Sequence, residues 1–482
     1  MNKIVYNFKL LIIVLLILIS PIASSISVKI TEINKITKEN EIIQVIKIAQ
    51  YPKFGGGCDE SIQILFNYTW KINDKIYKFE IRGLTLAEVA GKGEKPLNVE
   101  NYDLLYVGVN YWSFIKDGLR PKLVKNIKKF LSNGGGYLGS CAGAVFASQG
   151  YEKPKNLIER RVNKAVLQIM DAYINFDFFG EPMYCIKSNG LPPIELKVEK
   201  NNSNPIFNLY TNETLNLTYG GGPGLYNANL SDQNLGEMTT LLTFNEELME
   251  TKPIHFWKKR ILGWKKGEVI KTDLLGNDCG IATTFNDSGR IVVFAAHAEI
   301  QLVLDGHIEE FIGKAPTYCN LGIFPRPVYA WIGNTSFNFS FNWWIHRRAA
   351  AWIAGVPDED LPPCNELMVY MDKPQFRLGY KLYVNDKIKN PLLGKRLLNR
   401  ILSRIDKTII FGDITVEALA ENSNIVEFYL DDILEYTDTE SPFQWNLNKN
   451  LSGVHRLEIR AYDEYGNYAC DGSEFMFYNI KR

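Results

Sequence analysis

The first third of the chain alternates short apolar runs with stretches of helical spacing. Ile42–Ala49 is a β-branched apolar run and is predicted to be a buried strand. Two further strands are expected at Tyr77–Ile81 and at Asp103–Val109, an apolar run bounded by turns. Asp59–Tyr68 is expected to be a helix, and Pro121–Ser132 has apolar residues at helical spacing between a leading proline and a following glycine. Strands separated by helices predict an α/β domain with a mainly parallel sheet and helices on both faces.

The remainder of this domain is less regular. Residues 151–280 show no clear period, but Ile281–Phe285 and Arg290–Phe294 are joined by an Asn-Asp-Ser-Gly turn, as in a hairpin. Trp343–Val356 has apolar residues at helical spacing and is expected to close the domain. The α/β domain is therefore assigned to residues 41–356.

The tail of the chain follows a different period. Apolar and polar residues alternate in short runs with turn residues between them, most clearly in Ile425–Leu430 and His455–Tyr462. This pattern predicts an antiparallel β-sandwich at residues 406–482. Prolines before the sandwich mark residues 357–405 as a linker.

The N-terminus has the pattern of a targeting segment. Lys3 and Lys9 come before the unbroken apolar run Leu10–Ile19, and small residues follow that run. Residues 1–26 are therefore predicted to be a secretory signal peptide or, equally, an uncleaved membrane anchor of roughly 20 residues, a buried core helix being the alternative. Residues 27–40 form a polar spacer. Export places the protein at the outer face of the cell membrane or outside the cell.

The composition of the chain argues against some classes of partner and cofactor. The chain has 482 residues, and 54 Lys+Arg balance 54 Asp+Glu, so nucleic acid is not expected as a partner. With five histidines and no Cys-x-x-Cys pair, a zinc ribbon has no support, and neither a metal nor another cofactor is expected.

Two further features agree with export. Nine Asn-x-Ser/Thr sequences fit a glycoprotein, although several arise by chance in a chain so rich in asparagine. Six cysteines besides Cys141 permit disulfides with no pairing fixed, or are buried free thiols: Cys58, Cys185, Cys279, Cys319, Cys364 and Cys470.

The most informative motif is a turn that carries a cysteine. Residues 135–147 read Gly-Gly-Tyr-Leu-Gly-Ser-Cys-Ala-Gly-Ala-Val-Phe-Ala, which places Cys141 between an expected strand and an expected helix. Gly139 and Gly143 leave room for a sharp turn, as in a nucleophile elbow. The helix N-terminus would favour the thiolate, and the backbone amide of Ala142 would point at an oxyanion. The alternative is an inert cysteine in a tight turn.

A histidine and a glutamate follow a later strand. His297 and Glu299 stand at the end of the apolar run that begins at Arg290. A thiol, an imidazole that takes its proton and a carboxylate that orients the imidazole are the parts of a cysteine nucleophile. A structural histidine and a solvated acid are the alternatives.

Two glycine loops and one aromatic pair are candidates for the substrate site. Gly221 and Gly222, in the loop from Tyr219 to Pro223, are expected to line it, whereas Gly55–Gly57 is more simply a flexible turn. Tyr111 and Trp112 follow the third strand, where open sheets place ligands, and packing explains them equally well. Trp343, Trp344 and Trp352 are expected in the core.

The elbow followed by His-x-Glu resembles the class I glutamine-amidotransferase-like superfamily. The string Gly-Gly-Gly-Tyr-Leu-Gly-Ser-Cys-Ala-Gly-Ala at 134–144 is most similar to the N-terminal domain of some biotin–protein ligases and their free-standing relatives. The resemblance covers roughly residues 41–356. It implies a flavodoxin-like α/β fold, with Cys141 as nucleophile, His297 as base and Glu299 as orienting acid.

The sequence departs from that family at two points. The third strand ends in Gly108-Val109-Asn110 in place of a Pro-Gly-Gly-like turn, so Gly108 is the residue left to complete an oxyanion hole. Ala298 replaces the usual proline between histidine and glutamate. A Gly-Arg-Gly-Arg-type loop does not occur, so biotinylation is not implied.

The tail resembles the immunoglobulin-like domains of secreted microbial proteins. Val426–Asp432 and Ala461–Asn467 carry this likeness. Such domains space or present a neighbouring domain outside the cell.

Three functions follow as hypotheses. The first is an exported cysteine hydrolase that cleaves a small amide or peptide through Cys141, His297 and Glu299. The second is a non-catalytic extracellular module that binds a ligand or a cell-surface partner. The third, a cytosolic amidotransferase subunit, is disfavoured by the export segment.

Overall fold

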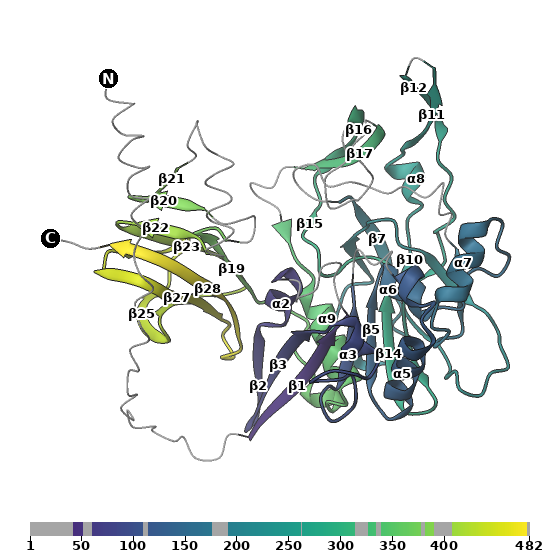
Figure 1. Cartoon of the computed structure of the whole chain (residues 1–482), viewed down its shortest axis with the longest axis horizontal. Helices are drawn as coiled ribbons and strands as arrows, with labels where there is room; N and C mark the ends of the chain where they lie inside the picture. The colour runs from purple at the N-terminus through teal and green to yellow at the C-terminus, as the bar shows by residue number, and fades with distance from the viewer. Residues whose placement is uncertain are drawn as a thin grey trace.

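The computed structural model describes residues 42–51, 60–108, 114–175, 191–261, 263–313, 326–333, 339–376, 381–389 and 407–479. They form an α/β domain followed by a pair of mainly antiparallel sheets (Figure 1). The predicted targeting segment and spacer lie outside the described residues, as do Gly55–Gly57, Tyr111 and Trp112. Within the described ranges, no helix has both the length and the apolar character needed to cross a membrane.

Five parallel strands form the centre of the α/β domain. They lie side by side in the order β3 (Lys75–Gly83), β1 (Ile42–Gln50), β4 (Leu104–Val107), β5 (Gly136–Ser140) and β14 (Gly289–Phe294). Their carboxyl ends coincide, because Gln50 is level with Gly83, Val107 with Gly139, and Phe294 with Ser140. Residues that follow these strands therefore meet at one edge of the sheet.

Helices cover both faces of these strands, as the sequence predicted. In β4 every side chain is buried, but Leu104 and Tyr106 join one core cluster while Leu105 and Val107 join another. The first cluster includes α2 (Glu60–Phe66) and α9 (Trp343–Ile353). The second includes four further helices: α3 (Leu86–Val89), α5 (Pro121–Ser132), α6 (Ala142–Ala147) and α7 (Leu157–Ala165). Because successive side chains of β4 point into the two helical layers in turn, every residue of this strand is buried and its sequence is apolar throughout.

The whole sheet is mixed, so the prediction of a mainly parallel sheet was too simple. β2 (Tyr68–Ile72) lies antiparallel to β3, and β13 (Asp278–Phe285) lies antiparallel to β14. Beyond β13, the sheet continues through five more antiparallel strands: β10 (Thr239–Phe244), β7 (Pro193–Val198), β8 (Thr214–Thr218), β9 (Gly224–Asn227) and β6 (Ala172–Asn175). These strands come from the segment without a clear period.

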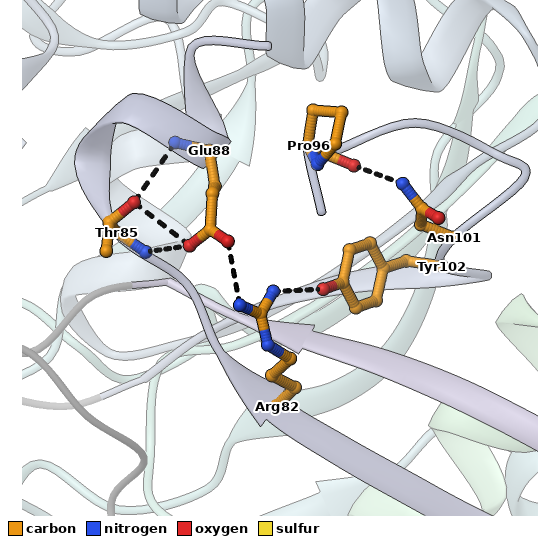
Figure 2. Close-up of polar contacts among 6 residues, drawn as sticks. All are labelled: Arg82, Thr85, Glu88, Pro96, Asn101 and Tyr102. Atoms are coloured by element: carbon orange, nitrogen blue, oxygen red, sulfur yellow. Dashed lines mark hydrogen bonds and ion pairs between the residues drawn. The ribbon is translucent and has the colours of Figure 1, made fainter. Parts of the chain in front are cut away.

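A polar cluster fixes the connection between β3 and β4 (Figure 2). Thr85 and Glu88 form a capping box at the start of α3, where the Thr85 hydroxyl accepts from the Glu88 amide and Glu88 Oε2 accepts from the Thr85 amide. Arg82 pairs with Glu88 Oε1 at 2.7 Å and donates to the Tyr102 hydroxyl at 2.8 Å. Asn101 donates to the Pro96 carbonyl at 2.9 Å. The cluster joins the end of β3, α3 and the approach to β4.

The C-terminal part consists of two sheets that share a core. One contains β19 (Met368–Lys373), β23 (Ile414–Glu421) and β26 (Phe443–Leu447). The other contains seven strands: β25 (Ile433–Asp438), β24 (Ile425–Leu430), β27 (Leu451–Tyr462), β28 (Tyr468–Asn479), β22 (Ile409–Phe411), β20 (Leu382–Val384) and β21 (Lys387–Ile388). Val369 from the first sheet and Phe428 and Phe475 from the second belong to one cluster. β19, β20 and β21 come from the segment expected to be a linker.

The two parts of the molecule are joined by main-chain pairing. Tyr68 and Thr69 of β2 pair with Ala469 and Tyr468 of β28, and the Lys71 amide donates to Asn467. The α/β sheet therefore continues, through its outer strand β2, into the seven-stranded sheet of the C-terminal part.

Two hairpins project from the α/β domain at the top of Figure 1. One is formed by β11 (His255–Arg260) and β12 (Gly263–Val269), and the other by β16 (Gly306–Gly313) and β17 (Arg326–Gly333). The described part of the chain also contains four shorter elements: α4 (Phe114–Asp117), α8 (Leu248–Thr251), β15 (Leu302–Val303) and β18 (Phe339–Ser340).

Candidate active site

Cys141 occupies a strained turn between β5 and α6. Its φ of 50° and ψ of −103° lie in a region that residues with a side chain seldom adopt. The Cys141 amide donates to the Phe294 carbonyl at 2.7 Å, and the Cys141 carbonyl accepts from the Ala144 amide at 2.9 Å. These bonds hold the turn between β14 and α6, with the cysteine partly exposed. The geometry is that of the elbow predicted from the sequence.

Two glycines make this turn possible by allowing backbones to approach closely. A Cβ atom on Gly139 would lie 2.9 Å from the Gly143 carbonyl. A Cβ atom on Gly143 would lie 2.1 Å from the Val107 carbonyl oxygen. Any side chain at either position would push α6 away from β4 and β5. The flanking glycines therefore fix the height at which Cys141 stands above the sheet.

His297 and Glu299 form a buried pair just beyond β14. Nδ1 of His297 lies 2.9 Å from Oε1 of Glu299, and both side chains are almost fully buried. Burial disfavours the charge on His297, but the Glu299 carboxylate and the Cys141 side chain outweigh it and raise the pKa of His297 to about 10. Burial also disfavours the charge on Glu299, but His297 outweighs it and lowers the pKa of Glu299 to about 2. The pair is thus held as imidazolium and carboxylate.

Cys141 reaches the same histidine. A side-chain hydrogen bond between Cys141 and His297 contributes to the raised pKa of His297. Because Nδ1 is held by Glu299, Nε2 is the nitrogen left for the thiol. The three residues predicted from the sequence therefore lie together at the carboxyl edge of the parallel strands.

The glycine loop after β8 borders the imidazole. The His297 amide donates to the Thr218 carbonyl at 2.8 Å, which brings the loop alongside. A Cβ atom on Gly220 would lie 2.7 Å from His297 Nε2. Gly222 instead packs against the Ala295 carbonyl, and Gly221 has a φ of 89°. The glycine nearest the base is Gly220, whereas Gly221 and Gly222 shape the loop backbone.

Gly108 and Ala142 flank Cys141 at this edge. Gly108 directly follows β4, whose end is level with β5, and Ala142 is the first residue of α6. A Cβ atom on Gly108 would lie 2.7 Å from the Tyr106 ring. Only a glycine therefore fits here without displacing that ring. Both amides stay predictions as oxyanion donors.

Ser140 is part of the site but was missed in the sequence. Its Oγ donates to Glu299 Oε1 at 2.7 Å, and the residue is fully buried. Trp343 donates from Nε1 to the Glu299 carbonyl at 3.3 Å. Glu299 is therefore oriented by a serine and a tryptophan from two different elements. The one feature of the sequence that could have identified Ser140 is its position directly before the proposed nucleophile, Cys141.

His346 is the second residue that the sequence did not indicate. It lies on α9 with no exposed surface, between Phe294 and Tyr106 at ring distances of 5.5 and 6.0 Å. Its Nε2 is 3.8 Å from Glu299 Oε2. In the sequence, His346 falls within the helix Trp343–Ile353 like any core residue. Only the folded structure shows that it is a buried histidine beside a carboxylate.

The other described cysteines are free thiols with unreactive surroundings. Burial raises the pKa of Cys279 and of Cys470 to about 12 and also raises the pKa of Cys364. No disulfide joins these three residues, and the remaining three cysteines lie outside the described ranges. Among the residues described, no group of three or more His, Cys, Asp or Glu could hold a metal ion.

The central part of the chain has a recognisable relative. Residues 109–310 match the family described as "Biotin-protein ligase, N terminal". The match includes Cys141, His297 and Glu299 and ends within the β16–β17 hairpin. It covers less than half of the chain.

Whole-protein comparisons add little to this match. No curated protein matches the chain. The glutaminase domain of Trypanosoma brucei CTPS, solved with bound acivicin, is similar at 12% identity, with 53% of this chain and 86% of that one covered and a TM-score of 0.25. Fibronectin(III)-like modules of Clostridium thermocellum CbhA are similar at 17% identity, with 24% and 100% covered and a TM-score of 0.16. Scores this low do not establish a shared fold.

Proposed function

We propose that the α/β domain is a glutamine-amidotransferase-like cysteine hydrolase that cleaves an amide or peptide bond. The observation that carries the proposal is Cys141 on a positive-φ turn, hydrogen-bonded to a histidine that is itself held by a buried glutamate. The strand order β3-β1-β4-β5-β14 supports a flavodoxin-like arrangement, because it is 2-1-3-4-5 when only the parallel strands are counted. The match to the biotin–protein ligase N-terminal family agrees with it.

The first half of the proposed reaction forms a thioester. Transfer of the thiol proton to Nε2 of His297 gives a thiolate beside the imidazolium, and Sγ of Cys141 then attacks the carbonyl carbon of the amide. Glu299 accepts from Nδ1–H and stabilises the imidazolium. The amides of Ala142 and Gly108 are proposed to face the oxyanion. The carbon–nitrogen bond then breaks, and the leaving amine takes its proton from His297.

The second half regenerates the thiol. Water attacks the thioester carbonyl while Nε2 of His297 accepts a proton from it. The carbon–sulfur bond breaks, a carboxylic acid is released, and Cys141 regains its proton from His297. The residues needed for this sequence are all supplied by the chain.

Alkylation of Cys141 tests the assembled nucleophile. Purified protein treated with iodoacetamide is expected to gain one adduct, located at Cys141 by peptide mass mapping. The rate should fall about 10²-fold or more in His297→Ala, since the base is lost. Cys279→Ser is the matched control and should leave the rate unchanged, because the pKa of that buried thiol is raised to about 12. Ammonia release from glutamine and from peptide amides then tests turnover.

A non-catalytic binding module is the second candidate. The turn Gly108-Val109-Asn110 favours it, because it departs from the Pro-Gly-Gly-like turn that completes the oxyanion hole in the family. Slow alkylation of Cys141 that is indifferent to His297→Ala would select this candidate. A cell-surface or small-molecule partner would then be sought by capture on the intact protein.

We further propose that the protein is exported and that its tail is an immunoglobulin-like spacer. The basic, apolar and small-residue order at residues 1–26, the nine Asn-x-Ser/Thr sequences and the two facing C-terminal sheets support this proposal. Cell fractionation with protease accessibility, together with sequencing of the mature N-terminus, distinguishes a secreted protein, an anchored protein and a protein that stays inside the cell.

A further inference from the structure

The β11–β12 hairpin carries an unusual concentration of positive charge. Between His255 and Val269 it has five cations, Lys258, Lys259, Arg260, Lys265 and Lys266, against one acid, Glu268. The whole chain has no net charge. The excess is therefore local, and it is placed on an element that projects from the domain (Figure 1).

Three of these cations share one face of the hairpin. Lys258 pairs directly with Lys265 across the two strands, and Arg260 follows Lys258 by two residues on the same face. Like charges placed opposite one another destabilise a strand pair. Among the described residues, no ion pair neutralises these three side chains. An anionic partner would relieve their repulsion.

The opposite face is used to anchor the hairpin to the protein. Glu310 of β16 accepts from Trp257 Nε1 at 2.9 Å and lies 2.7 Å from His255 Nδ1 and 3.4 Å from Lys266 Nζ. The Tyr329 hydroxyl donates to the His255 carbonyl at 2.8 Å. The base of the hairpin is therefore tied to the domain, and Lys258, Arg260 and Lys265 on the other face are exposed to solvent.

Ile261, the residue that follows β11 toward the tip of the hairpin, is apolar and fully exposed. Ile261 follows Arg260 and is 102% exposed, the highest value among the large hydrophobic residues of the described chain. An isoleucine at this position contributes nothing to the core. A soluble polyanion offers such a side chain no apolar surface, whereas a lipid bilayer places hydrocarbon directly beneath its anionic headgroups.

We propose that the β11–β12 hairpin docks the α/β domain onto an anionic lipid surface. Lys258, Arg260 and Lys265 contact the headgroups, and Ile261 enters the hydrocarbon boundary below them. The surface required is a bilayer rich in acidic phospholipid. This docking does not depend on the proposed hydrolase activity.

Hydrogen exchange on the full chain tests this proposal at the hairpin itself. The protein is mixed with vesicles of phosphatidylcholine alone, or of phosphatidylcholine and phosphatidylglycerol in equal parts, and exchange is followed in peptides covering residues 255–269. Slower exchange is expected only with phosphatidylglycerol. Any contribution of the N-terminal segment to vesicle binding appears in other peptides and in both lipids.

Two variants and one control separate the contributions. Ile261→Ser should lower the ratio of docked to undocked hairpin about tenfold, because the gain from burying one large aliphatic side chain is lost. Lys258→Glu combined with Lys265→Glu should abolish the protection. Leu157→Ser is the matched control, because Leu157 is also strongly exposed, at 81%, but lies on α7, and it should behave as wild type.

Three results would overturn the proposal. Equal protection by both kinds of vesicle would remove the role of headgroup charge. Loss of protection in Leu157→Ser would show that the effect is not specific to the hairpin. Protection by soluble heparin that is insensitive to Ile261→Ser would assign the hairpin to a polyanion.

Discussion

Nε2 of His346 lies 3.8 Å from Oε2 of Glu299, the carboxylate oxygen that His297 does not use. Neither this oxygen nor either ring nitrogen of His346 has a hydrogen-bond partner among the described residues. Burial lowers the pKa of His346 to about 4, so the ring is neutral at neutral pH. Glu299 therefore faces one charged and one neutral imidazole. The neutral ring leaves the carboxylate charge available to His297.

Replacement of His346 by an apolar residue should be tolerated. His346→Leu removes two buried nitrogen atoms that have no hydrogen-bond partner in the described part of the chain, so the free energy of unfolding is expected to stay unchanged or rise by about 1 kcal/mol. Cys141 alkylation should retain most of its rate, because His297 and Glu299 keep their contact. Urea unfolding and intact-mass kinetics check both expectations. A loss of several kcal/mol would mean that His346 makes a stabilising contact through a bound water.

Loss of the Ser140 hydroxyl should weaken the site more than loss of an ordinary buried hydroxyl. Ser140→Ala removes the hydrogen bond to the charged Glu299 and is expected to cost about 2 kcal/mol of unfolding free energy. Ser148→Ala is the matched control, because Ser148 is equally buried but among the described residues its hydroxyl bonds two neutral groups, the Val145 carbonyl and the Gly150 amide, and it should cost about 1 kcal/mol. Equal losses measured by urea unfolding would contradict a charge-assisted bond.

The dependence of stability on pH should reflect the His297–Glu299 pair. The pKa of His297 is raised from 6.5 to about 10, so its stabilising contribution is complete below pH 6.5 and is lost as the pH rises toward 10. The pKa of Glu299 is lowered from 4.5 to about 2, so its contribution is complete above pH 4.5 and is lost as the pH falls toward 2. The stability difference between wild type and Glu299→Gln should therefore be greatest from pH 4.5 to 6.5.

Urea unfolding at acidic, intermediate and alkaline pH measures this difference. The comparison is best repeated in a Cys141→Ala background, because the Cys141 side chain contributes to the raised pKa of His297. His346 also faces Glu299, but it stays neutral above pH 4 or so. A difference that is constant across the range would be incompatible with a coupled imidazolium and carboxylate.

A methyl group at position 220 should disable the base without unfolding the domain. In Gly220→Ala the new Cβ would lie 2.7 Å from His297 Nε2, so the imidazole must move away from Cys141. Displacement of a catalytic group by about 1 Å costs on the order of 10²-fold in rate. Gly222→Ala is the informative contrast, because its Cβ would meet the backbone carbonyl of Ala295 and should instead reduce stability. Alkylation rates and thermal unfolding of the two variants separate these effects.

Local patterns in the sequence predicted several elements of the α/β domain and the turn that carries Cys141. The helix at Pro121–Ser132 and the hairpin of β13 and β14 are confirmed, because a proline, a glycine and a short turn mark their limits. The turn at Cys141 could be predicted because close backbone approach leaves only glycine at positions 139 and 143.

Long-range pairing explains what the sequence did not predict. Strands β6 to β10 are half-buried pieces of four to six residues, and apart from the pair β7 and β8 their partners lie far away along the chain, so no local period identifies them. β19 precedes its partner β23 by more than forty positions, and it was therefore assigned to a linker. Ser140 and His346 act through Glu299, which approaches them only after folding.

The pairing of β2 with β28 has a consequence for solubility. β2 is the outermost strand of the α/β sheet, and an uncovered outer strand is a template on which a second molecule can add its own strand. β28 pairs with Tyr68 and Thr69 of this strand, and the Asn467 side chain accepts a hydrogen bond from the Lys71 amide. The C-terminal part thus shields the sheet against intermolecular growth, and an α/β domain cut free of it would expose a site for aggregation.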